Sequence, residues 1–361
     1  MSSAWDLGIF RHHVQERIDA EMARQRVVLA ELGPDMAQLV DAVEGLLAGG
    51  KRLRAAFCHS GYLACGGSHT EQMISVATAM EMFQAAALLH DDVMDDSATR
   101  RGRATAHRAL ANRHDEESWA GDADRFGVSG AILAGDLCLV WTDEMVAGSG
   151  LPADELDRAR TVFDVMRTQL MGGQFLDVLV SARGWDGLAT TERIEQTRQV
   201  VRYKSAKYSV EHPLLIGAHA AGVDAEDATH LSAYGLALGE AFQLRDDVLG
   251  IFGDPSTTGK PAGDDLREGK RTVLMALALD ALDASDTATM TAGLGRNDLA
   301  AEEIETMREL VRRSGALDLH EEIIVEQSAI ARAELAAATG LTDMGRAALE
   351  ELIDIATERD S

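Results

Sequence analysis

The sequence predicts an all-α protein, and three observations support this. Of its 361 residues 46% are apolar but only 4% are aromatic, and there are just five prolines. Alanine, leucine, glutamate and arginine, which favour helices, are abundant. Apolar residues recur at helical spacing, and no segment keeps the alternation with period two that is typical of a strand. We therefore expect a bundle of ten or more helices.

Residues that break or cap helices indicate where the predicted helices begin and end. Gly33-Pro34 ends the first one, and Ser68-His69-Thr70-Glu71 matches a capping box that begins a long one. No composition boundary divides the chain, so we expect one domain over residues 1–361, with residues 1–34 as an N-terminal helix. The other predicted helices cover about 35–48, 51–65, a part of 110–127, 128–148 (buried), 153–182, 190–207 (with a break at Pro213), 226–252 and several amphipathic segments from 271 onward. Three segments are predicted to be loops, 100–103, 184–189 and 253–269.

The long helix ends in an unusual acidic segment, His90-Asp91-Asp92-Val93-Met94-Asp95-Asp96. Asp91 and Asp95 share one helix face, and like charges at this spacing cost about 0.2–0.5 kcal/mol per pair. A magnesium ion would offset the repulsion, since Mg²⁺ is often held by carboxylates together with substrate phosphates. The segment therefore predicts a divalent metal site, and an acidic helix end followed by a loop is the alternative.

A second apolar run also ends in paired carboxylates, Phe242-Gln243-Leu244-Arg245-Asp246-Asp247-Val248-Leu249-Gly250. Two acidic helix ends could face each other across a cavity. The segment Gly253–Lys260 imitates a phosphate-binding P-loop, but its spacing is one residue too long and Pro261 stands where serine or threonine is required.

Together these segments resemble the motifs of the trans-isoprenyl diphosphate synthases, the polyprenyl synthetase family. The first matches DDxxD followed by Arg100-Arg101-Gly102, and the second matches the second aspartate-rich motif. Further landmarks follow in the family's order: Gly49–Arg54, Gly172–Asp177, Lys204–Ala206, Gly259-Lys260 and Asp264-Asp265. Gly250 departs from the pattern by replacing the third aspartate of the second motif, and Ser205 replaces the usual threonine. The resemblance extends from about residue 35 to the end and implies the isoprenoid synthase fold, with helices around a central apolar cavity.

The resemblance implies a Mg²⁺-dependent condensation of isopentenyl diphosphate with an allylic diphosphate. Three Mg²⁺ ions, which Mn²⁺ is expected to be able to replace, stabilise the departing diphosphate as the allylic C–O bond ionises. The resemblance also implies that the departing diphosphate takes the final proton; no dedicated protein base is evident in the sequence. The implied roles are as follows: Asp91, Asp95 and Asp246 bind metal; Asp92 and Asp247 support them; Arg100, Lys204 and Lys260 neutralise the allylic diphosphate; Gln243 and Ser205 place dipoles near the cation.

The second substrate needs its own anion site. Lys51, Arg54 and Arg101 match the family's ligands for isopentenyl diphosphate, and the planar guanidinium fork suits phosphate oxygens. Gln84 lies seven residues before Asp91, on the same helix face, and would add a hydrogen bond.

Product length is expected to depend on the residues upstream of the first motif. In this family, bulky residues four and five positions before DDxxD stop the growing tail. Here those positions are Ala87 and Ala86, and the next large side chains are Phe83 and Met82. We therefore expect geranylgeranyl diphosphate as the main product, with Phe83 or Met82 contributing to the pocket floor. The alternative is that the alanines only permit close helix packing.

The net charge and the amino-acid composition disfavour some classes of partner and cellular location. The net charge of −26 disfavours a nucleic-acid partner. Three cysteines without metal spacing, no signal peptide and no run of 18 apolar residues favour a cytoplasmic protein without a transmembrane segment.

The resemblance implies a homodimer. Alternatives are a farnesyl or longer-chain synthase, a weakly active regulatory subunit, for which Gly250 would be one lost motif residue, and a class I terpene cyclase. The cyclase is disfavoured because its Asn/Ser/Glu metal triad is missing near residues 240–250.

Overall fold

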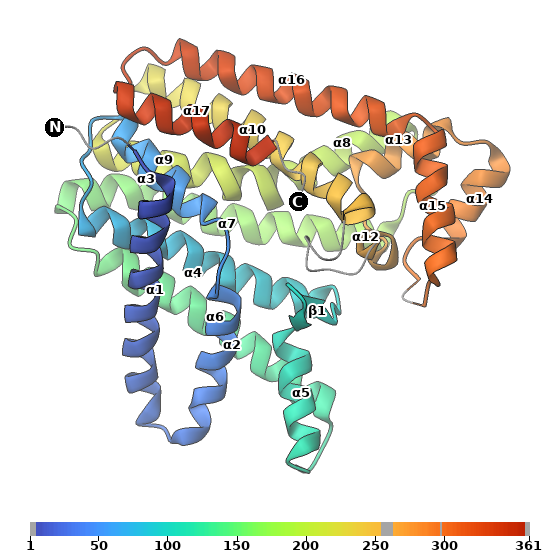
Figure 1. Ribbon diagram of the computed structural model, residues 1–361, viewed down its shortest axis with the longest axis horizontal. Helices are drawn as coiled ribbons and strands as arrows, with labels where there is room; N and C mark the ends of the chain where they lie inside the picture. Colours follow the sequence, from blue (N-terminus) through green and yellow to red (C-terminus); the bar gives the residue numbers. More distant parts are fainter. Residues whose placement is uncertain (1–4, 254–262, 297, 358–361) are drawn as a thin grey trace. The chain divides into compact units, whose positions relative to one another are not determined.

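The computed structural model describes residues 5–253, 263–296 and 298–357, and most of these are helical (Figure 1). The prediction of an all-α fold is confirmed. The helices are α1 (Leu7–Ala30), η1 (Pro34–Met36), α2 (Ala37–Leu47), α3 (Leu53–Ala64), α4 (Glu71–Met94), α5 (Ala106–Glu116), α6 (Ala123–Ala147), α7 (Ala153–Arg183), α8 (Thr190–Val200), η2 (Val201–Glu211), α9 (His212–Ala221), α10 (Ala225–Phe252), α12 (Asp264–Glu268), α13 (Val273–Ala281), α14 (Ala284–Gly293), α15 (Ala301–Arg313), α16 (Ala316–Ala337) and α17 (Asp343–Thr357). A single antiparallel hairpin, β1 (Thr99–Arg100) with β2 (Arg103–Ala104), is the sheet structure of the described residues.

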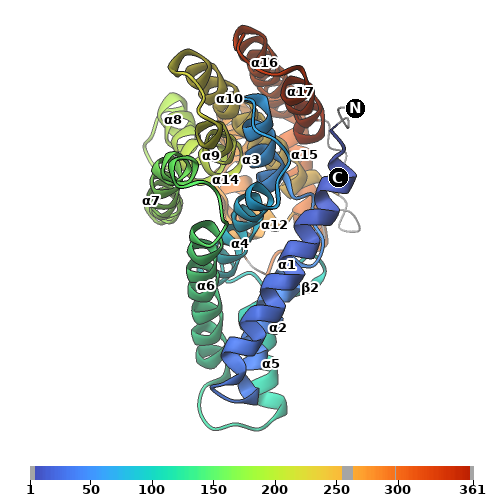
Figure 2. The same cartoon turned by 90° about the vertical axis from the view of Figure 1, so that its left-hand side faces the viewer.

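The contacts divide the chain into two compact units. The first runs to Arg160 and adds Pro213–Val223 and Leu341–Ala347, while the second contains Thr161–His212, Asp224–Gly340 and the chain from Ala348 onward. In the first unit α4 packs against α1, α3 and α6 (Figure 2). In the second unit α10 packs against η2, α12, α13 and α16. Each unit thus surrounds one of the two helices that carry the acidic motifs. The prediction of a single domain stays a prediction.

Several local predictions were wrong. The long helix α4 is capped by Thr70, whose hydroxyl accepts a hydrogen bond from the Met73 amide, so Ser68 is not its cap. Residues 264–268, predicted to lie in a loop, form the short helix α12. Pro213 does not interrupt the helical structure, because it lies at the start of α9, directly after the π-helical segment η2. A proline is tolerated in the first turn of a helix, where its missing N–H is not needed.

Two helices, α4 and α6, are long and apolar enough to cross a membrane by length and composition alone. In α4, 78% of the most apolar window is buried inside the protein, as expected of a core helix. In α6 the buried share is 39%, so the prediction that this helix is buried was only partly right. Its exposed residues include Phe126, Leu133 and Val140, which recur every seven positions and therefore share one helix face.

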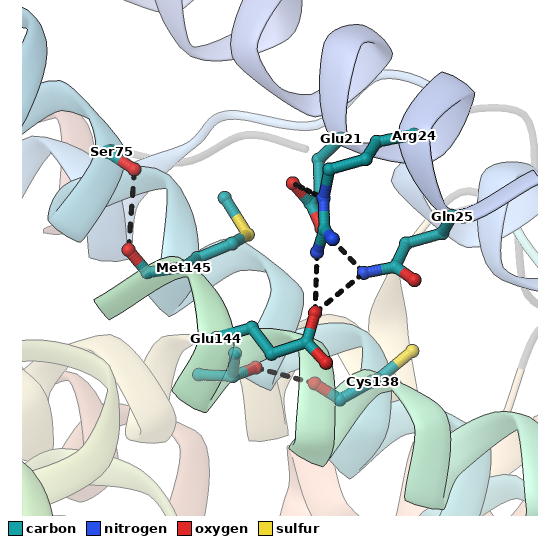
Figure 3. A network of polar contacts seen from close by, with 8 residues as sticks. Glu21, Arg24, Gln25, Ser75, Cys138, Glu144 and Met145 are labelled. Atoms are coloured by element: carbon teal, nitrogen blue, oxygen red, sulfur yellow. Dashed lines mark hydrogen bonds and ion pairs between the residues drawn. The ribbon is translucent and has the colours of Figure 1, made fainter. Parts of the chain in front are cut away.

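A polar network fastens α1 to α6 in the first unit (Figure 3). The Arg24 guanidinium donates to Glu21 at 2.7 Å and also pairs with Glu144. The Gln25 side chain donates to Glu21 and Glu144 at 2.8 and 3.0 Å. Hydrogen bonds from Arg24 lower the pKa of the Glu144 carboxyl. The buried Glu21 thus accepts hydrogen bonds from Arg24 and Gln25, three and four residues later on α1, and these bonds offset the cost of burying its carboxylate.

A histidine cluster connects the start of α1 to α3. The buried His59 ring lies 5.5 Å from Trp5 and 4.7 Å from Phe10, measured between ring centroids. Its Nε2 is 3.0 Å from Nδ1 of His69. Burial lowers the pKa of His59 to about 3, and the neighbouring His69 and His13 lower it further. The ring is therefore neutral in the folded protein at pH 5–7.

This cluster predicts that acid destabilises the protein before its carboxylates titrate. An unfolded histidine has a pKa near 6.5, so between pH 7 and pH 5 the unfolded chain gains a proton at His59 that the folded chain does not bind. The free energy of unfolding should then fall by roughly 2 kcal/mol at pH 5. His59→Phe should flatten this decrease, as measured by urea unfolding at pH 5, 6 and 7. His12→Phe, at an exposed position of α1, is the control; equal pH slopes in wild type and His59→Phe would contradict the prediction.

Candidate active site

The first aspartate-rich segment forms the last turn of α4, in the first unit. Asp92 is buried, with 1% exposure, and receives three hydrogen bonds of 2.6–3.0 Å from the Arg100 guanidinium. Asp91 is partly exposed, and its carboxylate lies 3.9 Å from Arg100. Asp96 is exposed and pairs with Arg108 at 2.7 Å. Asp92 is thus held inside the protein, whereas Asp91 is partly exposed; the predicted roles of these two carboxylates stay predictions.

The position of Arg100 follows from the local sequence. Thr99 pairs with Ala104, and Arg100 pairs with Arg103, so Arg101-Gly102 form a two-residue hairpin turn. Both turn residues have positive φ, 51° and 72°, which is the requirement of a type I′ turn. The predicted polar loop is therefore a tight hairpin. It holds Arg100 against Asp92 and places Arg101 at the tip.

Cationic side chains gather around this hairpin. Arg101 donates to the Leu46 carbonyl at 2.9 Å. Burial lowers the pKa of Arg101, and the positive charges of Arg100, Arg52 and Arg54 lower it further. Arginines that repel one another at close range make a site that an anion would stabilise. Lys51 is exposed and Arg54 partly buried, and the buried Oε1 of Gln84 finds no hydrogen-bond donor in the part of the chain that the structure describes.

A cavity of about 440 Å³ opens beside the hairpin, within the first unit. Two arginines that the motifs do not identify, Arg103 and Arg113, line it together with Arg100 and Arg101. The sequence does contain a signal for them, because five arginines fall between residues 100 and 113 of a chain with net charge −26. An anionic ligand is therefore favoured at this hairpin despite the overall charge.

The second aspartate-rich segment lies on α10, in the second unit. Asp246 is partly exposed, whereas Asp247 is buried, with 5% exposure. The Gln243 amide donates to Asp247 Oδ1 at 2.9 Å, so it orients this carboxylate, whereas the motif implied a dipole for Gln243 near the cation. Asp247 Oδ2 is buried and has no hydrogen-bond donor among the described residues.

The environment of Asp247 bears on whether a metal fits here. Burial raises the pKa of Asp247 well above its ordinary value, and the charges of Asp265 and Asp246 raise it further. An orphaned buried oxygen beside two other carboxylates is a set of hard donors that a divalent cation would satisfy. No group of three or more His, Cys, Asp or Glu side chains is already arranged around a metal position in the described residues. Mg²⁺ usually takes one or two carboxylates and completes its shell with water and phosphate.

Lys204 lies on η2, whose eleven residues form a π-helix. Its ammonium group pairs with Asp177 of α7 at 2.6 Å. The two helices approach closely because position 173 is glycine: a Cβ there would lie 2.5 Å from the backbone nitrogen of Lys204. Segments of π-helix are frequent at functional sites. Ser205 follows Lys204 and is partly buried, and Lys260 lies outside the described residues.

The chain-length positions lie on α4, upstream of Asp91. Phe83 and Met82 are buried, with 1% and 0% exposure. Ala86 is also fully buried, whereas Ala87, one turn before Asp91 on the same face, is partly exposed. Ala86 and Ala87, for which the sequence predicts the same role, thus differ in their exposure to solvent.

Known proteins are similar to this chain over most of its length. The polyprenyl synthetase family model matches residues 36–311. The geranylfarnesyl diphosphate synthase of Aeropyrum pernix is 32% identical over 278 residues, which is 76% of this chain and 79% of that protein. The geranylgeranyl diphosphate synthase of Mycobacterium tuberculosis is 32% identical over 270 residues, 74% of this chain and 69% of that protein.

A solved structure is similar over nearly the whole chain. The geranylgeranyl pyrophosphate synthase from Corynebacterium glutamicum, complexed with isoprenyl diphosphate and magnesium, has a TM-score of 0.93 and 39% sequence identity, covering 98% of this chain and 100% of its own. The motifs, the all-α fold and these similarities agree on one family. The chain therefore belongs to the polyprenyl synthetase family and is a prenyltransferase.

Proposed function

We propose that this protein condenses isopentenyl diphosphate with allylic diphosphates and that geranylgeranyl diphosphate is its main product. The observation that carries the proposal is the position of Arg100: its guanidinium binds Asp92 and lies 3.9 Å from Asp91, and Arg100 lines a cavity together with three other arginines. The small residues Ala86 and Ala87 support a C20 product, as does the similarity to geranylgeranyl diphosphate synthases. Incubation with isopentenyl diphosphate and each allylic primer, followed by chromatography of the products, tests it directly.

Mg²⁺ is the proposed cofactor, with three ions per active site and Mn²⁺ as a substitute. Asp91 and Asp95 of the first motif and Asp246 of the second would hold the ions. When bound, Mg²⁺ neutralises the charge that develops on the departing diphosphate. Arg100, through its three hydrogen bonds, fixes the orientation of the Asp92 carboxylate at the end of α4, and Gln243 orients one oxygen of Asp247. Lys204 and Lys260 are proposed to bind the allylic diphosphate.

Variants at the two proposed diphosphate sites should impair the use of different substrates. Arg54 belongs to the cationic group around Arg101, so Arg54→Ala should raise the KM for isopentenyl diphosphate by about tenfold to a hundredfold, since a charge-assisted hydrogen bond is worth about 1.5–3 kcal/mol. Lys204→Ala should chiefly impair the allylic substrate. Steady-state kinetics with each substrate varied in turn measures both effects. Equal effects of both variants on both substrates would rule out the division.

A homodimer is the proposed assembly, and the exposed face of α6 supports it. Leu133 and Val140 are 55% and 54% exposed and share that face with Phe126. Apolar faces of this kind are typical of protein interfaces. Leu133→Glu with Val140→Glu should yield a monomer in light scattering coupled to size exclusion. Val325→Glu, at a valine of α16 that is 67% exposed, is the control and should leave the assembly unchanged.

We also propose a cytoplasmic location. Cys58 and Cys138 are free thiols that are buried in the protein. Burial raises the pKa of both buried thiols. Unreactive free thiols suit a reducing compartment. Labelling of the native protein with a thiol reagent in non-reducing buffer should modify at most Cys65.

A further inference from the structure

The cavity beside the hairpin is lined by α2, α5 and the hairpin itself, all in the first unit. Ala42 and Gly45 lie on its wall from α2, and Ala106 and Ala109 lie on its wall from α5. The two residues of each pair are three positions apart and therefore share one helix face. Side chains this small leave the space between the two helices open. We call this space of about 440 Å³ the hairpin cavity.

The hairpin cavity is distinct from the proposed isopentenyl diphosphate site. Lys51, Arg54 and Gln84, which the family resemblance assigns to that substrate, are not among the described residues that line the cavity. Arg100 and Arg101 line it and are also assigned to the two substrates. The cavity therefore adjoins the substrate sites at the hairpin but lacks the other residues assigned to them.

The charge of the hairpin cavity is positive. Arg103 is exposed, and its guanidinium has no carboxylate partner among the residues that the structure describes. Arg113 pairs with Glu117 at only 4.0 Å. Asp41 also lines the cavity, but its carboxylate is bound by Arg26 at 2.8 Å. Four arginines and one carboxylate that is already paired therefore line this cavity, in a protein of net charge −26. Positive charge gathered in this way favours an anion.

The start of α5 adds to this preference. Thr105 precedes the helix, but its hydroxyl donates to the Ser97 carbonyl at 2.8 Å, and no side chain of the described residues caps α5. The first amides of this eleven-residue helix thus have no side-chain acceptor. Thr105 and Ala106 both line the hairpin cavity, so this end of α5 borders it. An uncapped helix start attracts negative charge, especially that of a phosphate group.

We propose that the hairpin cavity is a second binding site for a diphosphate group, and that its occupancy inhibits turnover. The guanidinium fork matches phosphate oxygens, and a diphosphate has enough oxygens to contact several arginines at once. Inhibition follows from Arg100, which donates three hydrogen bonds to Asp92 and also lines the cavity. A diphosphate in the cavity would compete with Asp92 for this guanidinium. Only the inhibition rests on the proposed reaction, because binding can be measured without turnover.

Binding is tested by calorimetric titration of the protein with inorganic diphosphate in metal-free buffer. The test variant is Arg103→Gln with Arg113→Gln. Arg108→Gln with Arg125→Gln is the matched control, because it also removes two positive charges but neither residue lines the cavity. Wild type and control should bind one equivalent more than the test variant, whose affinity at this site should be about a hundredfold lower or less, since each lost charge-assisted hydrogen bond corresponds to about tenfold or more. Equal stoichiometry and affinity in wild type and test variant would overturn the proposal.

Inhibition is tested with excess diphosphate at saturating substrates and constant free Mg²⁺. Wild type and control should lose turnover that the test variant retains, and an equal loss in all three proteins would overturn the inhibitory role. Titration with geranylgeranyl diphosphate identifies the source of the group: if it alone distinguishes the variants, the ligand is a prenyl diphosphate, and if both compounds do, the diphosphate group is sufficient. A wild type that binds diphosphate in the cavity but forms no prenyl product would instead contradict the proposed function, so the two failures are distinguishable.

Discussion

Asp91→Ala and Asp246→Ala are each expected to reduce turnover by about 1,000-fold or more. Each removes a proposed metal ligand, and a metal ion contributes several kcal/mol to the stabilisation of a departing diphosphate, where about 1.4 kcal/mol corresponds to a factor of ten. The loss should appear in kcat, because the charge on the diphosphate grows only as the C–O bond breaks. Turnover is measured at saturating Mg²⁺ with both substrates in excess.

Asp96→Ala is the matched control for Asp91→Ala. It removes a carboxylate from the same segment, but Asp96 is exposed and already paired with Arg108. Turnover within a few-fold of wild type is expected. Near-normal turnover of Asp91→Ala would contradict the metal assignment, and a loss in Asp96→Ala as large as that in Asp91→Ala would show that the segment acts through its total charge.

The sequence predicted the helices well because helix boundaries depend on nearby residues. The environment of Asp92 is a feature that the sequence alone does not predict. Its position in DDxxD suggested a supporting role, but only the hairpin turn at Arg101-Gly102, with its two positive φ angles, shows how Arg100 reaches it. The turn depends on backbone geometry that periodicity does not reveal.

Contacts between segments distant in the sequence were the least predictable part of the site. Gly173 and Lys204 meet because two helices pack closely, and the π-helical form of η2 has no signature in the residues themselves. Gly250 is the clearest example. In the sequence alone, Gly250 is a lost motif residue. The structure shows that the Asp265 carboxylate occupies the space that a side chain at position 250 would need. A contact of this kind links two positions that no local pattern connects.

Ala87→Phe is expected to shift the main product from geranylgeranyl to farnesyl diphosphate. Ala87 lies four residues before Asp91, about 6 Å along the helix, and on the same face. Its partial exposure means that a larger side chain has space toward which to extend. Phe83, another four residues upstream and buried, is the proposed floor for the longer product. A ring at position 87 would therefore raise the floor by about one helical turn.

Ala86→Phe is a poorer test than Ala87→Phe, because Ala86 is fully buried. Adding a ring to a packed contact typically costs about 1–3 kcal/mol, so this variant should lower the thermal midpoint whatever its effect on products. Ala87→Ser, which keeps the side chain small, is the control and should retain the wild-type product. Chromatography of products from active Ala87→Phe measures the outcome. An unchanged C20 product in that variant would show that the tail does not pass Ala87, and that the alanines serve helix packing alone.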